Sequence, residues 1–431
     1  MTRCGKSIGL LLALAAVFVL IRLRVGSAAE AVWLIFPFGV FAGSWLGVIT
    51  PPRLGAKNRW SRWGSVFLLV AFPCGFYETL VVLTGSIWSW KEFLIALFFF
   101  GLSFEFALLY LFQAADAVHE RLSHGLSPLR AGLVKIAGRV VLYSVLIPWM
   151  FVIFAVHRPK LLPAPLSGFR AAEMESVTFT SRDGRTHLNG LFLKPSQKSR
   201  RGTVIVCHGV GANHADLEVI HRLLFDLGYQ VFAFDFRGHG ASDGHTVTYG
   251  WNEKDDVLGA YDWCLSQTDV SDKPLYALGA SMGGAILVQA LPQMPQVRAV
   301  ILDSAFADLT AMAEYQFRFF PHWSRRVFVQ IARGFAWIET GVDITRIKPS
   351  ETISHIEIPI LVIHGTADRI VPPENAQKLA AAGRHMKIHL ESECPHIGMA
   401  MLNPVGYSRL IDAQFRAAAT EPNRNSCWTL F

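Results

Sequence analysis

Ser281 stands in the sequence LGASMGGA (residues 278–285), between small residues that separate two apolar runs. A serine on a very tight turn from a strand into a helix has its hydroxyl exposed, and Gly279 and Gly283 would relieve the collisions that such a turn creates. The amide of Met282, the first of the expected helix, would point to the place where an oxyanion forms. This pattern predicts a nucleophilic serine; the alternative is an ordinary turn residue.

A nucleophilic serine needs a base that is itself oriented by an acid, because a hydroxyl is a poor nucleophile at neutral pH. Asp368 follows an apolar run in VIHGTADRIVP, and His396 lies in ECPHIGM near the end of the chain. The order Ser, Asp, His is the order of the strand, turn and helix arrangement that carries such a serine. We therefore expect Asp368 and His396 to serve Ser281, with Asp303 as an alternative orienting acid.

A second backbone donor to the oxyanion is expected from HGVGAN (residues 208–213). Gly209 and Gly211 would let the backbone approach a substrate closely, so the amide of Val210 is the predicted donor.

Four further histidines are given no catalytic role. His208 and His364 end apolar runs and are expected to hold loops by hydrogen bonds. His214 and His221 are expected on the exposed face of a helix.

A sheet must bring these residues together. Short apolar runs rich in Val and Ile, without strict alternation, are typical of strands buried on both faces of a mostly parallel sheet. The runs are 203–209, 231–236, 275–281, 297–303 and 360–365, with a further short strand expected in MKIHL (386–390). An antiparallel hairpin is predicted before them, in SVTFTSRDGRTHLNGLFLKP, with its turn at Asp183 and Gly184.

The motifs VIVCHGVGAN, FDFRGHGASDG, GASMGGA, DSAFADL, HGTADRIVPPENA and CPHIGM occur in this order between residues 204 and 399. Together they resemble the α/β-hydrolases, and within them the branch of the Bem46-like and serine aminopeptidase-like hydrolases. The resemblance covers about residues 173–418. It implies an α/β fold, with a mostly parallel eight-stranded sheet between helices, a helical lid at about 304–349, and an acyl-enzyme formed on Ser281 with Asp368 and His396.

The chain before residue 158 has a different composition and resembles no family that we identify. A bilayer core about 30 Å thick needs about 20 apolar residues in a helix. Five stretches qualify, namely 8–25, 31–50, 65–87, 93–115 and 140–156, although the first could be a cleaved signal peptide. We expect an all-α transmembrane region over 1–157, a Pro-rich linker over 158–172, an α/β-hydrolase domain over 173–420 and a tail over 421–431.

The distribution of positive charge predicts the orientation of these spans, because cytoplasmic loops collect Lys and Arg. With five spans, one side carries ten such residues and the other five. The richer side would be cytoplasmic, and the hydrolase domain would then lie on the non-cytoplasmic side of the cell membrane. Four spans would place the domain in the cytoplasm, which is the alternative. The residues of the richer side are Arg3, Lys6, Arg53, Lys57, Arg59, Arg62, Arg121, Arg130, Lys135 and Arg139.

The net charge of +7 needs no nucleic acid to explain it, because loops beside membrane spans are basic and no nucleic-acid-reading motif is present. The six cysteines show no metal-ligand spacing, and no phosphate-binding loop is evident. No metal and no cofactor are therefore predicted, and the oligomeric state stays open.

The predicted lid contains AEYQFRFFPHWSRRVFVQIARGFAWIE (313–339), which is dense in aromatic residues and arginines. Such a cover suits an acyl chain or another amphiphile, and the alternative is ordinary helix packing. The leading hypothesis is a membrane-anchored serine hydrolase that cleaves a carboxylic ester or thioester. The alternatives are a serine peptidase of the same fold and a membrane transport or scaffold protein whose hydrolase-like domain only binds ligands.

Overall fold

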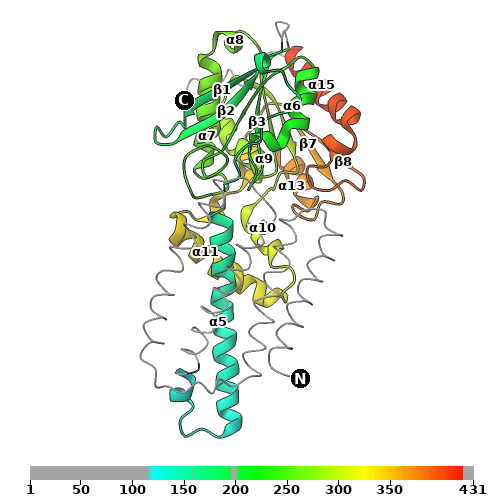
Figure 1. The fold of residues 1–431 in the computed structure, drawn as a ribbon. Helices are drawn as coiled ribbons and strands as arrows, with labels where there is room; N and C mark the ends of the chain where they lie inside the picture. Colours follow the sequence, from blue (N-terminus) through cyan, green and yellow to red (C-terminus); the bar gives the residue numbers. More distant parts are fainter. Residues whose placement is uncertain (1–115, 117, 159, 196–200, 421–431) are drawn as a thin grey trace, which may run out of the picture. The chain divides into compact units, whose positions relative to one another are not determined.

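The computed structural model describes residues 116, 118–158, 160–195 and 201–420 (Figure 1). The four predicted spans 8–25, 31–50, 65–87 and 93–115 and the tail 421–431 lie outside the described residues.

The centre of the fold is an eight-stranded sheet in the order β1-β2-β4-β3-β5-β6-β7-β8. β1 pairs antiparallel with β2, β2 pairs antiparallel with β4, and all other neighbours are parallel. The predicted hairpin and the mostly parallel sheet are thus confirmed. The strands are β1 (Met174–Thr180), β2 (His187–Leu193), β3 (Thr203–Cys207), β4 (Gln230–Phe234), β5 (Leu275–Ala280), β6 (Val297–Asp303), β7 (Ile360–Gly365) and β8 (Met386–Glu391).

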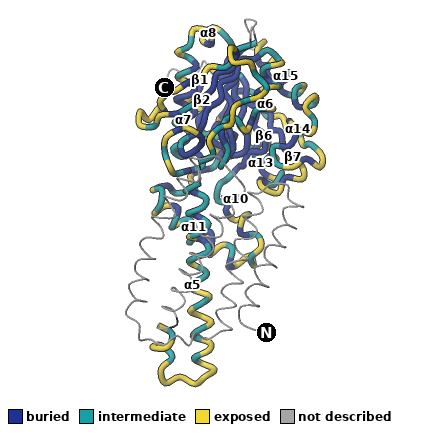
Figure 2. The backbone as a smooth tube through the Cα atoms, viewed as in Figure 1, coloured by how far each residue is buried: buried dark blue, intermediate teal, exposed yellow. Residues whose placement is uncertain are grey.

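Helices cover both faces of this sheet, so the central strands are buried on both sides (Figure 2). Successive side chains of a strand point to opposite faces. In β3, Ile205 and Cys207 pack into one core layer, and Val204 and Val206 pack into the other. The first layer contains α7 (Glu253–Ser266), α9 (Met282–Ala290), α12 (Pro349–Ile353) and α13 (Glu374–Ala382). The second contains α6 (Glu218–Asp226), α14 (Met399–Leu402) and α15 (Pro404–Thr420).

The segment predicted as a lid is helical and contacts the loop after β7. It contains α10 (Leu309–Gln316), α11 (His322–Thr340) and a short 3-10 turn, η4 (Ile344–Arg346). The Tyr315 hydroxyl of α10 donates a hydrogen bond to the carbonyl of Arg369 over 3.1 Å. Met312 and Val342 share a small apolar cluster with Ala285 of α9. The segment is therefore attached to the elements that carry Ser281 and Asp368.

A long apolar helix, α5 (Pro128–Val156), precedes the sheet. Among the described residues it is the one helix long and apolar enough to cross a membrane, with a mean hydropathy of 2.1 over an 18-residue window. The predicted span 140–156 is the C-terminal part of this helix. The helix begins earlier than the predicted span. Charged residues limit an apolar span but do not end a helix, and the arginines and lysine at positions 130, 135 and 139 are good helix formers.

The chain divides into two compact units between Ile147 and Pro148, within α5. The last residues of α5 therefore belong to the unit that contains the sheet. The carbonyl of Val156 accepts a hydrogen bond from the Val247 amide, and the carbonyl of Ala155 accepts one from the Tyr249 hydroxyl. These bonds explain why the unit begins before residue 158, the start of the predicted linker.

Candidate active site

Ser281 lies between the last residue of β5 and the first residue of α9. Its backbone has φ 53° and ψ −120°, a conformation that costs an L-residue energy and persists only when its surroundings impose it. The amide of Ser281 donates to the carbonyl of Asp303 over 2.7 Å, which fixes the turn to the end of β6. The predicted sharp turn is present, and it places the serine hydroxyl at the carboxyl edge of the sheet.

Glycines surround this turn because side chains would not fit. A Cβ on Gly283 would lie 2.4 Å from the carbonyl oxygen of Cys207, and a Cβ on Gly279 would lie 2.5 Å from the Cα of Gly284. Both distances are shorter than any real contact. Gly284 was not singled out from the sequence, yet its Cβ would lie 2.8 Å from that of Ala305. The second glycine of SMGG could have indicated in the sequence that a side chain does not fit at this position either.

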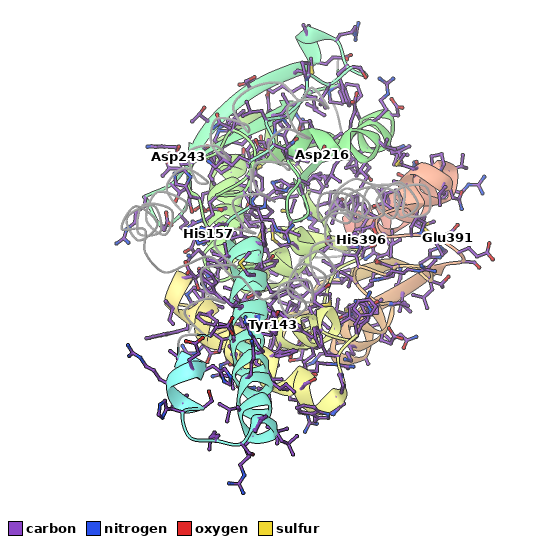
Figure 3. All side chains as sticks on the ribbon, turned by 60° about the horizontal axis from the view of Figure 1, so that its bottom comes forward. Tyr143, His157, Asp216, Asp243, Glu391 and His396 are labelled. Atoms are coloured by element: carbon purple, nitrogen blue, oxygen red, sulfur yellow. The ribbon has the colours of Figure 1, made fainter. Side chains whose placement is uncertain are left out.

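His396, which is labelled in Figure 3, lies in the loop after β8. It is within hydrogen-bonding reach of both expected partners. Its Nε2 is 2.9 Å from the Ser281 hydroxyl oxygen, and its Nδ1 is 2.6 Å from Oδ2 of Asp368. A carboxylate can only accept, so Nδ1 carries a proton and Nε2 is left to accept from the serine hydroxyl. The structure therefore brings together all three residues predicted from the sequence.

Asp368 is held in its ionised form by several donors. Its Oδ1 accepts hydrogen bonds of 2.9 Å from the amides of Ile370 and Val371. Burial raises the pKa of Asp368, but hydrogen bonds from His364 and His396 outweigh it and lower the pKa to about 2. The carboxylate is thus charged throughout the neutral range, as the orienting acid of a histidine must be.

His364 is a second histidine on the same carboxylate, which the sequence analysis did not predict. Its Nε2 lies 3.2 Å from Oδ2 of Asp368 and 2.8 Å from the carbonyl oxygen of Val371. Burial by itself would lower the pKa of His364. The hydrogen bond to Asp368 outweighs this effect, so the pKa of His364 lies above its ordinary value. The expectation that His364 holds a loop is fulfilled, and the loop is the one that carries Asp368.

Asp303, the alternative orienting acid, bonds to other residues. It accepts hydrogen bonds from the hydroxyls of Tyr407 (2.8 Å) and Ser304 (2.9 Å), and burial raises its pKa. Ser304 in turn accepts a hydrogen bond of 3.1 Å from the amide of Ile397. Asp303 is therefore linked through Ser304 to the backbone beside His396, and no hydrogen bond or ion pair joins these two described residues, Asp303 and His396, directly. This role of Ser304 was not predicted from the sequence, although the residue lies in DSAFADL.

The loop after β3 lies against Ser281. A Cβ on Gly209 would be 3.3 Å from the Cβ of Ser281 and 3.8 Å from its hydroxyl oxygen. Within the described part of the chain, neither the Val210 amide nor the Met282 amide donates a hydrogen bond to a protein acceptor. The oxyanion role of these two amides stays a prediction.

His208 holds this loop in place. Its Nδ1 lies 2.7 Å from the carbonyl oxygen of Gly209, and its Nε2 accepts a hydrogen bond of 3.1 Å from the Phe236 amide. One donor and one acceptor on the ring correspond to a neutral imidazole. Burial lowers the pKa of His208 to about 3, which keeps the ring neutral.

His221 contradicts the expectation of an exposed helical face. It is fully buried in α6, and neither ring nitrogen has a hydrogen-bond partner among the described residues. His214 is largely buried as well, and its Nδ1 lies 2.8 Å from Oδ1 of Asp235. The expectation failed because His221 lies between the apolar Ile220 and the charged Arg222. From the sequence its ring could point to the core or to solvent, and only tertiary packing decides between the two.

Three buried histidines make the domain sensitive to mild acid. Burial lowers the pKa of His221 and His208 to about 3 and that of His239 to about 4. These pKa values lie below the ordinary histidine value of about 6.5. As the pH falls, the three histidines therefore bind protons in the unfolded chain before they bind them in the folded chain. The free energy of unfolding should thus decrease from about pH 6.5 downward, by about 2 kcal/mol per histidine at about pH 5.

The variant His221→Leu tests this prediction. It should be more stable than the wild type, and its loss of stability between about pH 7 and about pH 5 should be smaller by about 2 kcal/mol. Urea unfolding of the detergent-solubilised chain measures both quantities. His187→Gln, which changes an exposed histidine, is the control and should behave like the wild type. An unchanged acid response in His221→Leu would refute the explanation.

A metal centre is not evident in the part of the chain that the structure describes, where no three His, Cys, Asp or Glu side chains are grouped to hold an ion. The cysteines described, Cys207, Cys264 and Cys394, are buried thiols, and burial raises the pKa of each. They are therefore poor nucleophiles, and Ser281 remains the candidate.

The strand order, the sharp turn at Ser281 and its position at the carboxyl edge of the sheet define an α/β hydrolase. The comparisons agree, and the chain belongs to the α/β-hydrolase superfamily. A family model described as serine aminopeptidase, S33, matches residues 198–351.

Two relatives and one solved structure illustrate the similarity. The protein YfhR of Salmonella typhimurium is 30% identical over 231 residues, which are 50% of this chain and 72% of YfhR. The lysophosphatidylserine lipase ABHD12 of Danio rerio is 28% identical over 193 residues, 43% of this chain and 48% of that protein. The esterase Pf2001 of Pyrococcus furiosus is 19% identical, with 61% of this chain and 99% of that one covered and a TM-score of 0.49.

Proposed function

We propose that the protein is a membrane-anchored serine hydrolase that cleaves a carboxylic ester or thioester. The observation that carries the proposal is the continuous chain of hydrogen bonds from Asp368 through His396 to the hydroxyl of Ser281, at 2.6 and 2.9 Å. Nucleophile, base and orienting acid are all within the reach that acyl transfer requires.

In this mechanism the Ser281 oxygen attacks the carbonyl carbon of the substrate while Nε2 of His396 takes the hydroxyl proton. The tetrahedral oxyanion accepts hydrogen bonds from the amides of Val210 and Met282. His396 then gives its proton to the leaving oxygen or sulfur, the bond from carbon to that atom breaks, and an acyl-enzyme remains. Water, deprotonated by His396, attacks the acyl-enzyme and releases the acid and a free Ser281.

Lipid-like acyl groups are the proposed substrates. The helical segment attached to the site is rich in aromatic residues, which favours a long acyl chain over a polar one. The similarity to ABHD12, which is named a lysophosphatidylserine lipase, supports a lipid ester.

The proposed anchor is the N-terminal region with its five predicted spans, of which the last is the C-terminal part of α5. The length and apolar character of α5 support this proposal. We place the hydrolase domain on the non-cytoplasmic side of the cell membrane, on the distribution of Lys and Arg, with the cytoplasmic side as the alternative.

A serine peptidase is the second candidate, because the matching family model is described as serine aminopeptidase. The same three residues can cleave an amide, so the site alone does not distinguish the two reactions. A panel of acyl esters, thioesters and aminoacyl amides distinguishes them, and we expect the highest kcat/KM for an ester or thioester.

A fluorophosphonate probe tests whether the site is catalytic at all. The probe phosphonylates an activated serine, so membranes that contain the wild type should be labelled at the size of the chain and membranes that contain Ser281→Ala should not. The exposed variant Ser266→Ala is the control and should be labelled like the wild type. A wild type that stays unlabelled would favour the alternative of a membrane transport or binding protein.

A further inference from the structure

One face of α11 carries apolar side chains that are exposed. Trp323 is 74% exposed, Trp337 61% and Ile338 67%. Residues three or four positions apart lie on the same side of a helix, and the exposed positions follow this spacing. We call these positions the outer face of α11: His322, Trp323, Arg326, Val327, Gln330, Gly334, Trp337 and Ile338.

The opposite face of α11 packs against the protein through Phe328, Val329, Ala332 and Ala336, so the helix already has its core contacts. The outer face therefore exposes large apolar side chains, interspersed with polar ones, that these core contacts do not use. Tryptophan and arginine together, beside aliphatic residues, are typical of helices that lie at the boundary between lipid headgroups and acyl chains.

The last turns of α5 hold α11 at the end of an apolar helix. Within the unit that contains the sheet, the Trp149 ring lies 6.5 Å from the Phe335 ring, and Nε2 of His157 lies 3.1 Å from Oε2 of Glu339. The apolar residues of α5 end at Val156. If α5 spans a bilayer, the boundary between lipid and water falls near this point, where α11 is attached.

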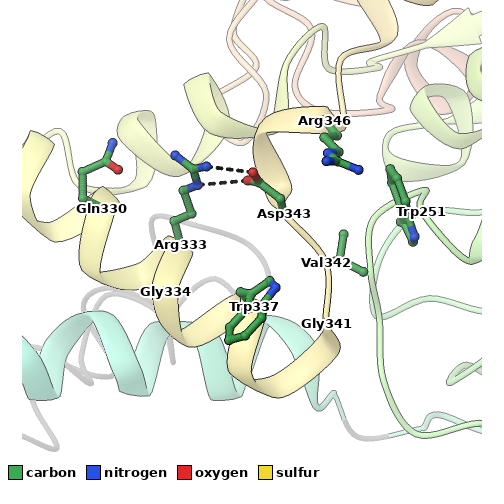
Figure 4. Close-up of a pocket in the computed structure, with 9 residues that line it drawn as sticks. All are labelled: Trp251, Gln330, Arg333, Gly334, Trp337, Gly341, Val342, Asp343 and Arg346. Atoms are coloured by element: carbon green, nitrogen blue, oxygen red, sulfur yellow. Dashed lines mark hydrogen bonds and ion pairs between the residues drawn. The ribbon is translucent and has the colours of Figure 1, made fainter.

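A groove of about 650 Å³ lies at the C-terminal end of α11 (Figure 4). Trp337 of the outer face and Trp251 are among its lining residues, together with Arg346. The Arg346 guanidinium lies 5.8 Å from the centre of the Trp251 ring, and the Lys254 ammonium lies 5.1 Å from it.

The residues that line this groove carry more positive than negative charge. Arg333, which also lines it, is paired with Asp343 through two hydrogen bonds of 2.9 and 2.7 Å. Neither Arg346 nor Lys254 pairs with a carboxylate among the residues that the structure describes. Arg346 is therefore the cation of the groove lining that remains to attract an anion from outside the chain, and Lys254 lies beside the same tryptophan ring.

We propose that α11 is an interfacial helix that inserts its outer face into the bilayer that α5 spans, and that the groove binds the headgroup of an anionic phospholipid. The inference rests on the proposed membrane anchor and not on the chemistry of Ser281. It adds a consequence for the proposed reaction, because an amphiphilic ester could reach the site from the lipid phase without crossing water.

Site-directed fluorescence tests the insertion. The full-length chain is reconstituted into vesicles of phosphatidylcholine and phosphatidylglycerol, with a fluorophore attached at Trp323→Cys or at Ile338→Cys. Cys4, Cys74 and Cys427 are replaced by serine, and the other three cysteines are buried. Val219→Cys on α6, which is 41% exposed, is the matched control.

A nitroxide on the lipid acyl chain should quench the fluorophore at 323 and 338 several-fold more strongly than at 219, and iodide in the water should do the reverse. Quenching at 323 and 338 by iodide alone would show that the outer face lies in water. Quenching by neither agent would show that protein covers it. Either result overturns the proposal.

The headgroup site is tested with the nitroxide attached to phosphatidylglycerol or to phosphatidylcholine. The ratio of quenching at 338 by these two lipids should exceed one in the wild type and fall to one in Arg346→Gln. Arg384→Gln, which changes an exposed arginine in the loop between α13 and β8, should keep the wild-type ratio. A ratio of one in the wild type would refute the headgroup site.

Two further measurements keep this proposal separate from the enzymatic one. Extraction of membranes at alkaline pH tests the anchor, and release of the chain would refute the anchor and the insertion together. The fluorescence experiments need no turnover and should give the same result with Ser281→Ala. Failure of the proposed hydrolase reaction would therefore leave their outcome unchanged.

Discussion

Replacing Ser281 by alanine is expected to lower kcat for a short-chain ester by about 10⁶-fold, and adding His396→Ala should lower it little further. The reason is that the two residues act as one unit. Without the hydroxyl the imidazole has no proton to take, and without the imidazole the hydroxyl at 2.9 Å is not activated. Hydrolysis of a p-nitrophenyl ester by the purified chain measures both variants.

The control for this prediction is folding. Ser281 is buried, but the change removes one oxygen from a turn whose backbone is held by the Asp303 carbonyl, so the thermal unfolding of Ser281→Ala should remain near that of the wild type. Losses that add in the double variant would show that the two residues act independently, and the proposed mechanism would then be wrong.

Asp368→Asn should lower kcat by about 10⁴-fold, because an amide at this position favours the wrong imidazole tautomer. In the wild type Oδ2 of Asp368 accepts the proton of Nδ1 over 2.6 Å, which leaves Nε2 free to accept from Ser281. An asparagine can donate to Nδ1 instead, which moves the ring proton to Nε2. The ester assay detects the loss.

Asp303→Asn is the matched comparison, since Asp303 is also a buried aspartate and lies at the end of the strand beside β7. Its hydrogen bonds go to Tyr407 and Ser304, so its replacement should lower the free energy of unfolding by about 1–3 kcal/mol and change kcat by about tenfold or less. A larger loss of kcat in Asp303→Asn than in Asp368→Asn would transfer the orienting role to Asp303.

Much of the fold was predictable because its signals are local. A strand buried on both faces is visible as a short apolar run, and the turn at Ser281 is visible as a serine among glycines. The six later strands were expected close to where the structure has them, and the hairpin of β1 and β2 was expected at Asp183 and Gly184. Such patterns depend on neighbouring residues and need no knowledge of the rest of the chain.

The sequence by itself determined the class of fold and nominated Ser281, Asp368 and His396, because each follows a recognisable strand. Only the tertiary structure decided between Asp303, which ends β6, and Asp368, which lies in the loop after the neighbouring strand β7, because their carboxylates contact different residues. It also decided that His221 faces the core and that Ser304 holds the backbone beside His396. These results depend on distances between residues far apart in the chain, and such distances are set by packing and not by any local pattern of residues.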